Sequence, residues 1–270
     1  MIRRYISRMI PECKFKMKLR LIINKWKGKK WPVPLKKLEL LGDEGLYLEL
    51  ENGLKFISEV HPLFDVFGSL QQHLAGPHTY EKYHELKRGE VVVDAGATIG
   101  TFTVLAAKSV GGEGLVIAIE PEKNNLENLK KNIKINGFNN VTIVPKGLWN
   151  RKDKKRFYLA DSTVMHSLMQ KSDKSGKIEV ETLDNILEKL RMSKVDFIKM
   201  NIEGAEIQAL KGMKRTLRNN DVDLVVVADH LVGGIPTYRI IVPWLKKVGF
   251  DAHEEGGFVY AKKSRVRENN

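Results

Sequence analysis

Val91-Val-Val-Asp-Ala-Gly-Ala-Thr-Ile-Gly-Thr-Phe-Thr103 is the stretch that decides the fold of this chain. Three consecutive valines followed by an acid are typical of a strand buried on both faces, and the residues after them follow a helical pattern. Gly96 can adopt a positive φ in the turn, and Gly100 removes a side chain where strand and helix pack. The stretch therefore predicts a buried parallel strand that turns into a helix, as in α/β folds.

The glycine spacing of this turn excludes two common nucleotide-binding loops. Gly96 and Gly100 do not complete the G-x-G-x-x-G fingerprint of dinucleotide-binding folds, and no Gly-Lys-Ser/Thr follows as it would in a phosphate loop. Asp94 ends the strand and suits a ligand that carries a positively charged amino group. The N-terminus of the helix offers backbone N–H groups to a carboxylate.

A second predicted strand, residues 115–120, ends in Glu120. A carboxylate at this point of an α/β fold can accept both hydroxyls of a ribose. S-adenosylmethionine carries an ammonium, a sulfonium, a carboxylate and a ribose, which two acids and a backbone turn can bind together. We therefore expect S-adenosylmethionine as the cofactor.

Three motifs of the chain resemble those of the FkbM family of class I S-adenosylmethionine-dependent methyltransferases. They are Val-Asp-Ala-Gly-Ala-Thr-Ile-Gly-Thr-Phe-Thr (93–103), Ile-Glu-Pro-Glu-Lys-Asn-Asn (119–125) and Val-Asp-Phe-Ile-Lys-Met-Asn-Ile-Glu-Gly-Ala-Glu (195–206). The third is the most specific to the family, and the resemblance extends over residues 60–262. It implies a Rossmann-like fold with a seven-stranded, mostly parallel sheet that ends in an antiparallel hairpin, plus an N-terminal β-hairpin extension.

The resemblance, together with the residue patterns above, also indicates which residues form the cofactor site. The expected cofactor-binding residues are Asp94, Ala95, Gly96, Thr98, Gly100, Thr101, Phe102, Glu120, Pro121, Asn124, Lys146, Gly147 and Asn201. Two of them differ from the family pattern, since family members usually have aspartate in place of Asn201 and often asparagine in place of Thr98. Asparagine cannot act as a base, whereas Thr98 is expected to bond locally and leave the cofactor pose unchanged.

The catalytic candidates follow two later strands, at the carboxyl ends where open α/β sheets bind their ligands. His230 follows the predicted strand 223–229 and is a candidate general base for a hydroxyl acceptor, or else a structural histidine. Glu203 follows the predicted strand 195–200 and either binds acceptor hydroxyls, deprotonates one, or caps a helix. Asn201 is the third expected catalytic residue, and the choice of base between His230 and Glu203 stays open. We expect no metal, because no cluster has a firm metal-ligand spacing.

Methyl transfer from a sulfonium is an in-line displacement, in which the protein mainly supplies proximity and orientation. The resemblance implies O-methylation of a hydroxyl on a sugar, a lipid-linked glycan or another small molecule. Two alternatives stay open: a tRNA or rRNA methyltransferase that uses the basic N-terminal arm, and a non-catalytic S-adenosylmethionine-binding protein, which Asn201 suggests. The chain has no Asn-Pro-Pro-Tyr motif for methylation of a base nitrogen, which argues against the first.

The net charge of +13 is concentrated at the N-terminus. Residues 1–38 hold 13 Lys or Arg and one acid, and so carry +12 of it. Such an arm suits an anionic membrane surface or a nucleic acid, or it packs its apolar residues on the body of the protein. The arm does not by itself decide between these partners, and the sequence leaves the oligomeric state open.

We divide the 270 residues into a basic arm (1–38), an N-terminal hairpin and helical cover (39–88), the methyltransferase domain (89–262) and a polar tail (263–270). Asn52-Gly53 between two strand-like runs predicts the hairpin, which we place outside the main sheet. Tyr80 or Glu81 is expected to reach the cofactor or acceptor. The polar loop 161–175, which contains His166, is expected to be a lid.

Cysteine content and hydropathy indicate the compartment. The chain has one cysteine, Cys13, and no apolar run long enough to span a membrane. We expect a cytoplasmic protein, with peripheral contact to a membrane through the basic arm.

Overall fold

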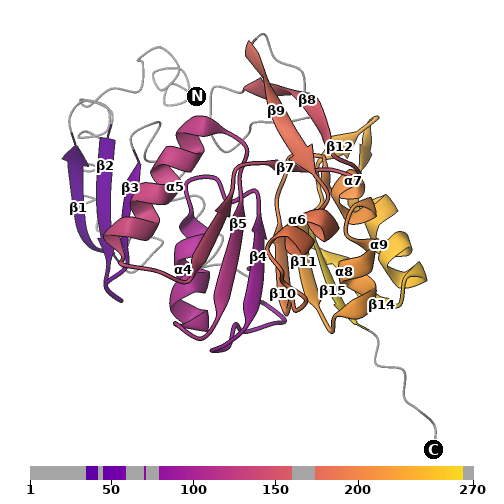
Figure 1. The fold of residues 1–270 in the computed structure, drawn as a ribbon, viewed down its shortest axis with the longest axis horizontal. Helices are drawn as coiled ribbons and strands as arrows, with labels where there is room; N and C mark the ends of the chain where they lie inside the picture. Colours follow the sequence, from indigo (N-terminus) through magenta and orange to yellow (C-terminus); the bar gives the residue numbers. More distant parts are fainter. Residues whose placement is uncertain (1–34, 42–44, 59–69, 71–78, 160–173, 264–270) are drawn as a thin grey trace, which may run out of the picture.

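The computed structural model describes residues 35–41, 45–58, 70, 79–159 and 174–263 (Figure 1). Its centre is a seven-stranded sheet with the order β14-β15-β11-β10-β4-β5-β6. These strands are β4 Val91–Ala95, β5 Leu115–Ile119, β6 Val141–Val144, β10 Phe197–Met200, β11 Asp223–Val227, β14 Phe250–Glu255 and β15 Phe258–Lys263. All neighbours from β6 to β11 are parallel, and β15 is antiparallel to both β11 and β14. The predicted class I methyltransferase sheet and its closing hairpin are confirmed.

Strand β4 lies in the middle of this sheet because it has apolar side chains on both faces. Val92 pairs with Val116 of β5 and with Phe197 of β10, and all three pack in one cluster with Phe102. The neighbouring residue Val93 points to the other face and joins a second cluster. A strand buried on both faces fixes the position of the residues that follow it, which here are those of the predicted site.

Helices cover both faces of the sheet. α4 Thr101–Val110 and α5 Lys123–Ile135 lie on the face toward Val92, whereas α6 Leu183–Lys189, α7 Glu206–Lys211, α8 Lys214–Asn219 and α9 Tyr238–Lys247 lie on the other. Glu122 caps α5 by accepting the N–H of Asn125, and Thr182 caps α6 by accepting that of Asn185. α5 ends at Ile135 and is followed by Asn136 and by Gly137, which has φ 70°.

A separate three-stranded antiparallel sheet precedes the main one, formed by β1 Leu35–Leu41, β2 Gly45–Leu50 and β3 Lys55–Ser58. The predicted hairpin is present between β2 and β3, with Gly53 at φ 84° in its turn. Residues 35–38, which we placed in the basic arm, belong to β1, because Leu35 and Leu38 pack against the core of the small sheet. The rest of the arm and residues 264–270 lie outside the described residues, so the four-part division stays a prediction.

Helix α5 closes the open edge of β3 with two asparagines. Asn136 accepts the N–H of Lys55 at 2.9 Å and donates to its carbonyl at 2.7 Å. Asn132, one turn earlier, does the same for Ile57 at 2.6 and 3.0 Å and also donates to the carbonyl of Ile99 at 2.7 Å. The spacing of four residues along the helix is similar in length to that of two residues along the strand. The two side-chain amides therefore pair with the backbone of β3 as a neighbouring strand would.

Two smaller hairpins complete the fold. β8 Asp153–Leu159 and β9 Lys174–Glu181 form an antiparallel ribbon that β7 Gly147–Leu148 joins, and β12 Leu231–Val232 pairs with β13 Ile235–Pro236. Residues 174–175, which we placed in the lid loop, belong to β9. The rest of that loop, including His166, lies outside the described residues. Within the described part of the chain, no helix is long and apolar enough to cross a membrane.

We expect the Asn132→Ala substitution to lower the free energy of unfolding by about 2–4 kcal/mol, because it leaves buried backbone groups of Ile57 and Ile99 without partners. Chemical denaturation monitored by circular dichroism measures this loss. Asn139→Ala, at an exposed position just beyond the same helix, is the matched control. An equal stability of the two variants would show that the amides do not hold the small sheet.

Candidate active site

A buried ion pair joins the two central strands below the site. Lys199 of β10 stands directly beside Asp94 of β4, and its Nζ lies 2.9 Å from Asp94 Oδ1. The same Nζ donates to the carbonyl of Gly96 at 2.9 Å, and the Thr103 hydroxyl donates to Asp94 Oδ2 at 2.6 Å. Burial acts to lower the pKa of Lys199, but the charge and hydrogen bond of Asp94, together with Tyr80 and Glu120, outweigh it, so the pKa lies above the usual value.

This pair changes how the role of Asp94 is understood. Both of its oxygens already accept hydrogen bonds, and the carboxylate is buried. Contact between Asp94 and the amino group of the cofactor stays a prediction. What the geometry provides is a carboxylate that holds Lys199, which in turn holds the glycine turn through Gly96.

The shape of the turn depends on close backbone approach. Gly96 has φ 79°, and a Cβ at this position would lie 2.0 Å from the carbonyl oxygen of Asn201. Gly100 has φ 90°, and a Cβ there would lie 2.5 Å from a methyl group of Leu129. Thr98 adopts φ 51°, a region that strains a β-branched residue and that asparagine tolerates, which gives a physical reason for the asparagine common in the family.

Glu120 ends the next strand and faces the same turn. Its carboxylate accepts the N–H groups of Thr98 and Glu122, both at 2.9 Å, and the side-chain amide of Asn125 at 3.4 Å. Burial raises the pKa of Glu120 to about 7, and these donors offset the effect only in part. A desolvated carboxylate in this state gains from further hydroxyl donors, such as those of a ribose.

Other predicted cofactor residues differ in how they can serve. Asn124 is exposed on α5, whereas the next residue, Asn125, is buried and reaches Glu120. Asn125 was not among the predicted cofactor residues. Its position on the buried side of α5, with Asn128 and Asn132, is the signal that could have pointed to it. Phe102 packs edge-on against the Tyr80 ring at 5.6 Å, so only its backbone remains for a ligand.

The remaining predicted cofactor residues lie at or next to the ends of strands and at the start of α4. Ala95 ends β4, Thr101 begins α4, Pro121 follows Glu120, Gly147 lies in β7, and Lys146 Nζ lies 3.6 Å from Glu179.

Asn201 follows β10 and closes the turn from the other side. Its N–H donates to the carbonyl of Ala95 at 3.0 Å, and its side chain hydrogen-bonds to the hydroxyl of Tyr80. Its Oδ1 is buried and has no hydrogen-bond partner among the described residues. A buried carbonyl oxygen of this kind indicates a ligand group that donates, such as an ammonium.

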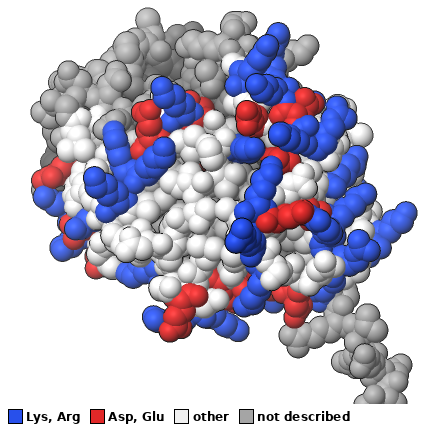
Figure 2. Space-filling view, viewed as in Figure 1, with Lys and Arg blue, Asp and Glu red and all other residues white. Residues whose placement is uncertain are grey.

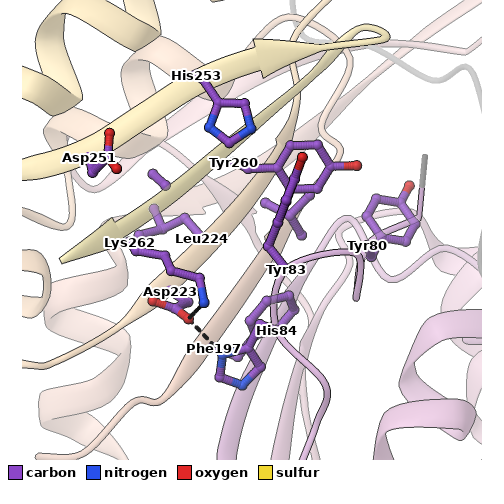
Figure 3. Close-up of a pocket in the computed structure, with 12 residues that line it drawn as sticks. Tyr80, Tyr83, His84, Phe197, Asp223, Leu224, Asp251, His253, Tyr260 and Lys262 are labelled. Atoms are coloured by element: carbon purple, nitrogen blue, oxygen red, sulfur yellow. Dashed lines mark hydrogen bonds and ion pairs between the residues drawn. The ribbon is translucent and has the colours of Figure 1, made fainter. Parts of the chain in front are cut away.

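Tyr80 belongs to a segment that crosses the same face of the sheet (Figure 3). The segment is held by the Tyr260 hydroxyl, which donates to the carbonyl of Thr79 at 3.0 Å, and by His84, whose Nδ1 lies 2.8 Å from Asp223. Figure 3 shows Tyr83 beside Tyr260, with ring centroids 4.9 Å apart and the rings nearly perpendicular, and both residues line a cavity of about 190 Å³. Apart from Tyr80, none of the residues expected to reach the cofactor or the acceptor lines this cavity.

His230, Glu203 and Glu206 come together beyond Asn201. His230 Nε2 lies 3.4 Å from Glu203 Oε2, and Nδ1 lies 3.1 Å from Glu206 Oε1. The second contact has the distance of an ion pair but not the direction of a hydrogen bond, so charge rather than directed bonding carries it. Glu206 also accepts the N–H groups of Ile202 and Gly204, as expected of an acid at the start of a helix.

The two carboxylates determine the protonation of His230. Burial acts to lower the pKa of His230, but Glu203 and Glu206 outweigh it and raise the pKa to about 10. His230 is then an imidazolium at neutral pH and has no lone pair with which to accept a proton. This favours Glu203 over His230 as the base and gives His230 the role of positioning Glu203, and the choice between them stays a prediction. Glu203 itself adopts φ 52°, a strained conformation often found at functional sites.

The family model of the methyltransferase FkbM domain matches residues 94–252, which span the glycine turn, Glu120, Asn201 and His230. The chain belongs to the FkbM methyltransferase family. It is an S-adenosylmethionine-dependent methyltransferase, and S-adenosylmethionine is its cofactor. No group of three or more His, Cys, Asp or Glu in the described residues is arranged to hold a metal ion.

Individual relatives are more distant. A protein of Saccharolobus solfataricus named "Probable cobalt-precorrin-6B C(15)-methyltransferase (decarboxylating)" is 29% identical over 145 residues, which cover 48% of this chain and 71% of that protein. Methyltransferase FkbM from Methylobacillus flagellatus KT is 21% identical with a TM-score of 0.47, over 73% of this chain and 53% of that chain. Fibrillarin from Aeropyrum pernix is 12% identical with a TM-score of 0.41, over 85% and 99%. The FkbM structure is thus matched over about half its length.

The residues at the strand ends fit S-adenosylmethionine. Glu120 would accept the ribose hydroxyls, the orphaned Oδ1 of Asn201 would accept from the ammonium, and the turn at Gly96 admits a ligand close to the backbone. When bound, the cofactor supplies a methyl group on a sulfonium that needs no further activation. The chain supplies orientation, through a turn that Lys199 fixes from below.

We expect the Lys199→Met substitution to lower the free energy of unfolding by about 3–5 kcal/mol, because it leaves the Asp94 carboxylate buried without its counter-charge. The double variant Asp94→Asn/Lys199→Met should recover part of the loss. Lys194→Met, which removes a mostly exposed partner of Asp196, is the control and should cost no more than about 1 kcal/mol. Denaturant titration of the four proteins measures this, and a loss no larger for Lys199→Met than for Lys194→Met would contradict the role of the pair.

We expect the affinity for S-adenosylmethionine to fall as the pH drops through about 7, because the ribose hydroxyls need the ionised form of Glu120. The fall approaches about tenfold per pH unit below the pKa of this group. Calorimetry between about pH 5.5 and 7.5 avoids the titration of the ligand amino group. Glu120→Gln should weaken binding by about 1–3 kcal/mol and remove the pH dependence.

Glu122→Gln is the matched control for this titration, since glutamine can still accept the N–H of Asn125 and cap α5. It should keep the affinity at neutral pH and the pH dependence, with a midpoint shifted slightly down because the Glu122 charge no longer raises the pKa of Glu120. Unchanged affinity in Glu120→Gln would refute the assignment of Glu120 to the ribose.

Proposed function

We propose that this FkbM methyltransferase transfers a methyl group to a hydroxyl oxygen of a sugar, a lipid-linked glycan or another small molecule. The observation that carries the proposal is the Glu203–His230 contact at the carboxyl ends of β10 and β11. It puts a carboxylate, which can accept the proton of a hydroxyl, in the loop next to the glycine turn.

The roles of the chain's own groups follow from their charges. Glu203 accepts a hydrogen bond from the acceptor hydroxyl and takes its proton as the oxygen is alkylated. The imidazolium of His230 keeps Glu203 in position, and Glu206 holds His230 from the other side. Asn201 is neutral, so in this proposal it contributes contacts rather than proton transfer.

The experiment is methyl-label transfer. Purified protein, labelled S-adenosylmethionine and an extract of the source cells are incubated and then separated into RNA, lipid, glycan and small-metabolite pools. We expect label in the lipid, glycan or metabolite pools, and the Glu203→Gln variant should lower the rate by about 10²–10⁴-fold while it keeps its affinity for the cofactor. Glu254→Gln, at an exposed position of β14, is the control and should transfer label at the native rate.

Other outcomes of this experiment contradict the proposal in distinct ways. Label in RNA would make the chain an RNA methyltransferase. Cofactor binding without label in any pool would favour a non-catalytic S-adenosylmethionine-binding protein. A native rate in Glu203→Gln would remove Glu203 from the catalytic step and leave the cofactor site unaffected.

A further inference from the structure

Two exposed features lie at the end of the molecule that carries the active site, and neither takes part in that site. One is the outward side of the β8–β9 ribbon, and the other is the short hairpin formed by β12 and β13 (Figure 1). β12 begins one residue after His230, and β7, which joins the ribbon, begins at Gly147 of the predicted cofactor site. Both features therefore adjoin the site through the chain itself.

The outward side of the ribbon is basic, and we call it the basic ribbon face: Arg151, Lys152, Lys154, Arg156 and Lys177, all exposed. Figure 2 shows Lys and Arg gathered over this end of the molecule. The inward side differs, because Lys155 lies 5.3 Å above the Trp149 ring and pairs with Asp153 at 2.9 Å. Basic side chains thus gather on the side that faces solvent.

One pair of like charges on the basic ribbon face destabilises the pairing of β8 with β9. Arg156 stands directly opposite Lys177 in the antiparallel register, and like charges in such positions destabilise a pair of strands. Among the described residues, no acidic side chain forms an ion pair with Lys154, Arg156 or Lys177. Glu179 stands opposite Lys154 in the same register and offsets part of the positive charge of this face. Arg156 and Lys177 face each other with no opposite charge across the ribbon, which favours an anionic partner outside the protein.

The β12–β13 hairpin presents apolar side chains to solvent. Leu231 is 59% exposed and Ile235 is 47% exposed, and the turn between them consists of Gly233 and Gly234, at φ 62° and 80°. Leu231 pairs with Pro236 and Ile235 pairs with Val232, so the two exposed side chains lie on opposite faces of the hairpin. Insertion of the hairpin by its Gly233–Gly234 tip would bury both of them. Such residues beside a basic surface are typical of proteins that rest on a bilayer.

We propose that the basic ribbon face and the β12–β13 hairpin form one docking surface for a bilayer that contains anionic phospholipids. Lys154, Arg156 and Lys177 contact the phosphate groups, and Leu231 and Ile235 enter the boundary between head groups and acyl chains. Aliphatic rather than aromatic side chains favour a bilayer over single-stranded nucleic acid, which stacks its bases on aromatic rings. The inference builds on the proposed function in one respect: a lipid-borne hydroxyl would reach the active site from this surface.

The test is co-sedimentation of the full chain with vesicles of phosphatidylcholine, with and without phosphatidylglycerol, in the absence of cofactor and acceptor. The triple variant Lys154→Ser/Arg156→Ser/Lys177→Ser should bind anionic vesicles roughly 10- to 100-fold more weakly, an effect that shrinks as salt is added. The control Lys211→Ser/Lys214→Ser/Arg218→Ser also replaces two lysines and one arginine, at exposed positions on α7 and α8. It should bind like the native chain, and all variants keep the N-terminal arm.

The apolar half of the surface is tested separately. Leu231→Ser should weaken binding to anionic vesicles by roughly 5- to 50-fold with little dependence on salt, because it removes buried apolar area. Val248→Ser, which is 39% exposed at the far end of α9, is its control. Leu231→Trp should show a larger blue shift of tryptophan emission on anionic vesicles than the native chain, which has four tryptophans of its own.

Several outcomes would overturn the proposal. Equal vesicle binding by the native chain and the triple variant would mean that other residues, such as the arm, carry any membrane affinity. A loss of RNA binding in the triple variant with vesicle binding unchanged would assign the basic ribbon face to nucleic acid. The vesicle experiment contains no cofactor or acceptor, so its result does not depend on catalysis. If the chain binds vesicles but transfers no label in the methyl-transfer experiment, the proposed function is refuted and this inference stands.

Discussion

The buried ion pair between Lys199 and Asp94 is the interaction on which the active site depends. A charge in the middle of a sheet is costly, and the pair is stable only because the hydroxyl of Thr103 and the carbonyl of Gly96 complete its hydrogen bonds. Two strands far apart in the sequence are thereby fixed in register at the level where both end. The glycine turn is built on this support, so its shape is set by the core and not by the turn alone.

The carboxylates of Glu120 and Glu203, beyond the strand ends, lie in environments that differ from that of Asp94. Glu120 is a carboxylate whose ionisation is opposed by burial, so it is prepared to accept donors from a ligand. Glu203 is a carboxylate with a fixed cationic neighbour, which orients it and keeps His230 protonated. Asp94, Glu120 and Glu203 thus lie in three different environments. Under the proposed function these environments suit them to support, cofactor binding and proton transfer respectively, although all three are carboxylates.

The sequence predicted the strands of the main sheet well because their apolar runs are long and end in glycine or acid. It also located Gly96, Glu120, Asn201, Glu203 and His230 at the same edge, since carboxyl ends of parallel strands must meet there. It could not show that Lys199 reaches under the turn to Asp94, because an apolar strand with one lysine gives no sign of which way that side chain points. The effect on His230 could not be predicted for the same reason: its pKa depends on Glu203 and Glu206, which follow another strand by three and six residues.

The asparagines on one side of α5 have a consequence for the evolution of this chain. Asn125 contacts the carboxylate that would bind the ribose, and Asn132 and Asn136 hold the small N-terminal sheet. One residue inserted between them would turn the later asparagines by about 100° around the helix axis and point them away from β3. The length of α5 and the direction in which its asparagines point are thus constrained at both ends. The N-terminal sheet and the cofactor site are therefore expected to change together.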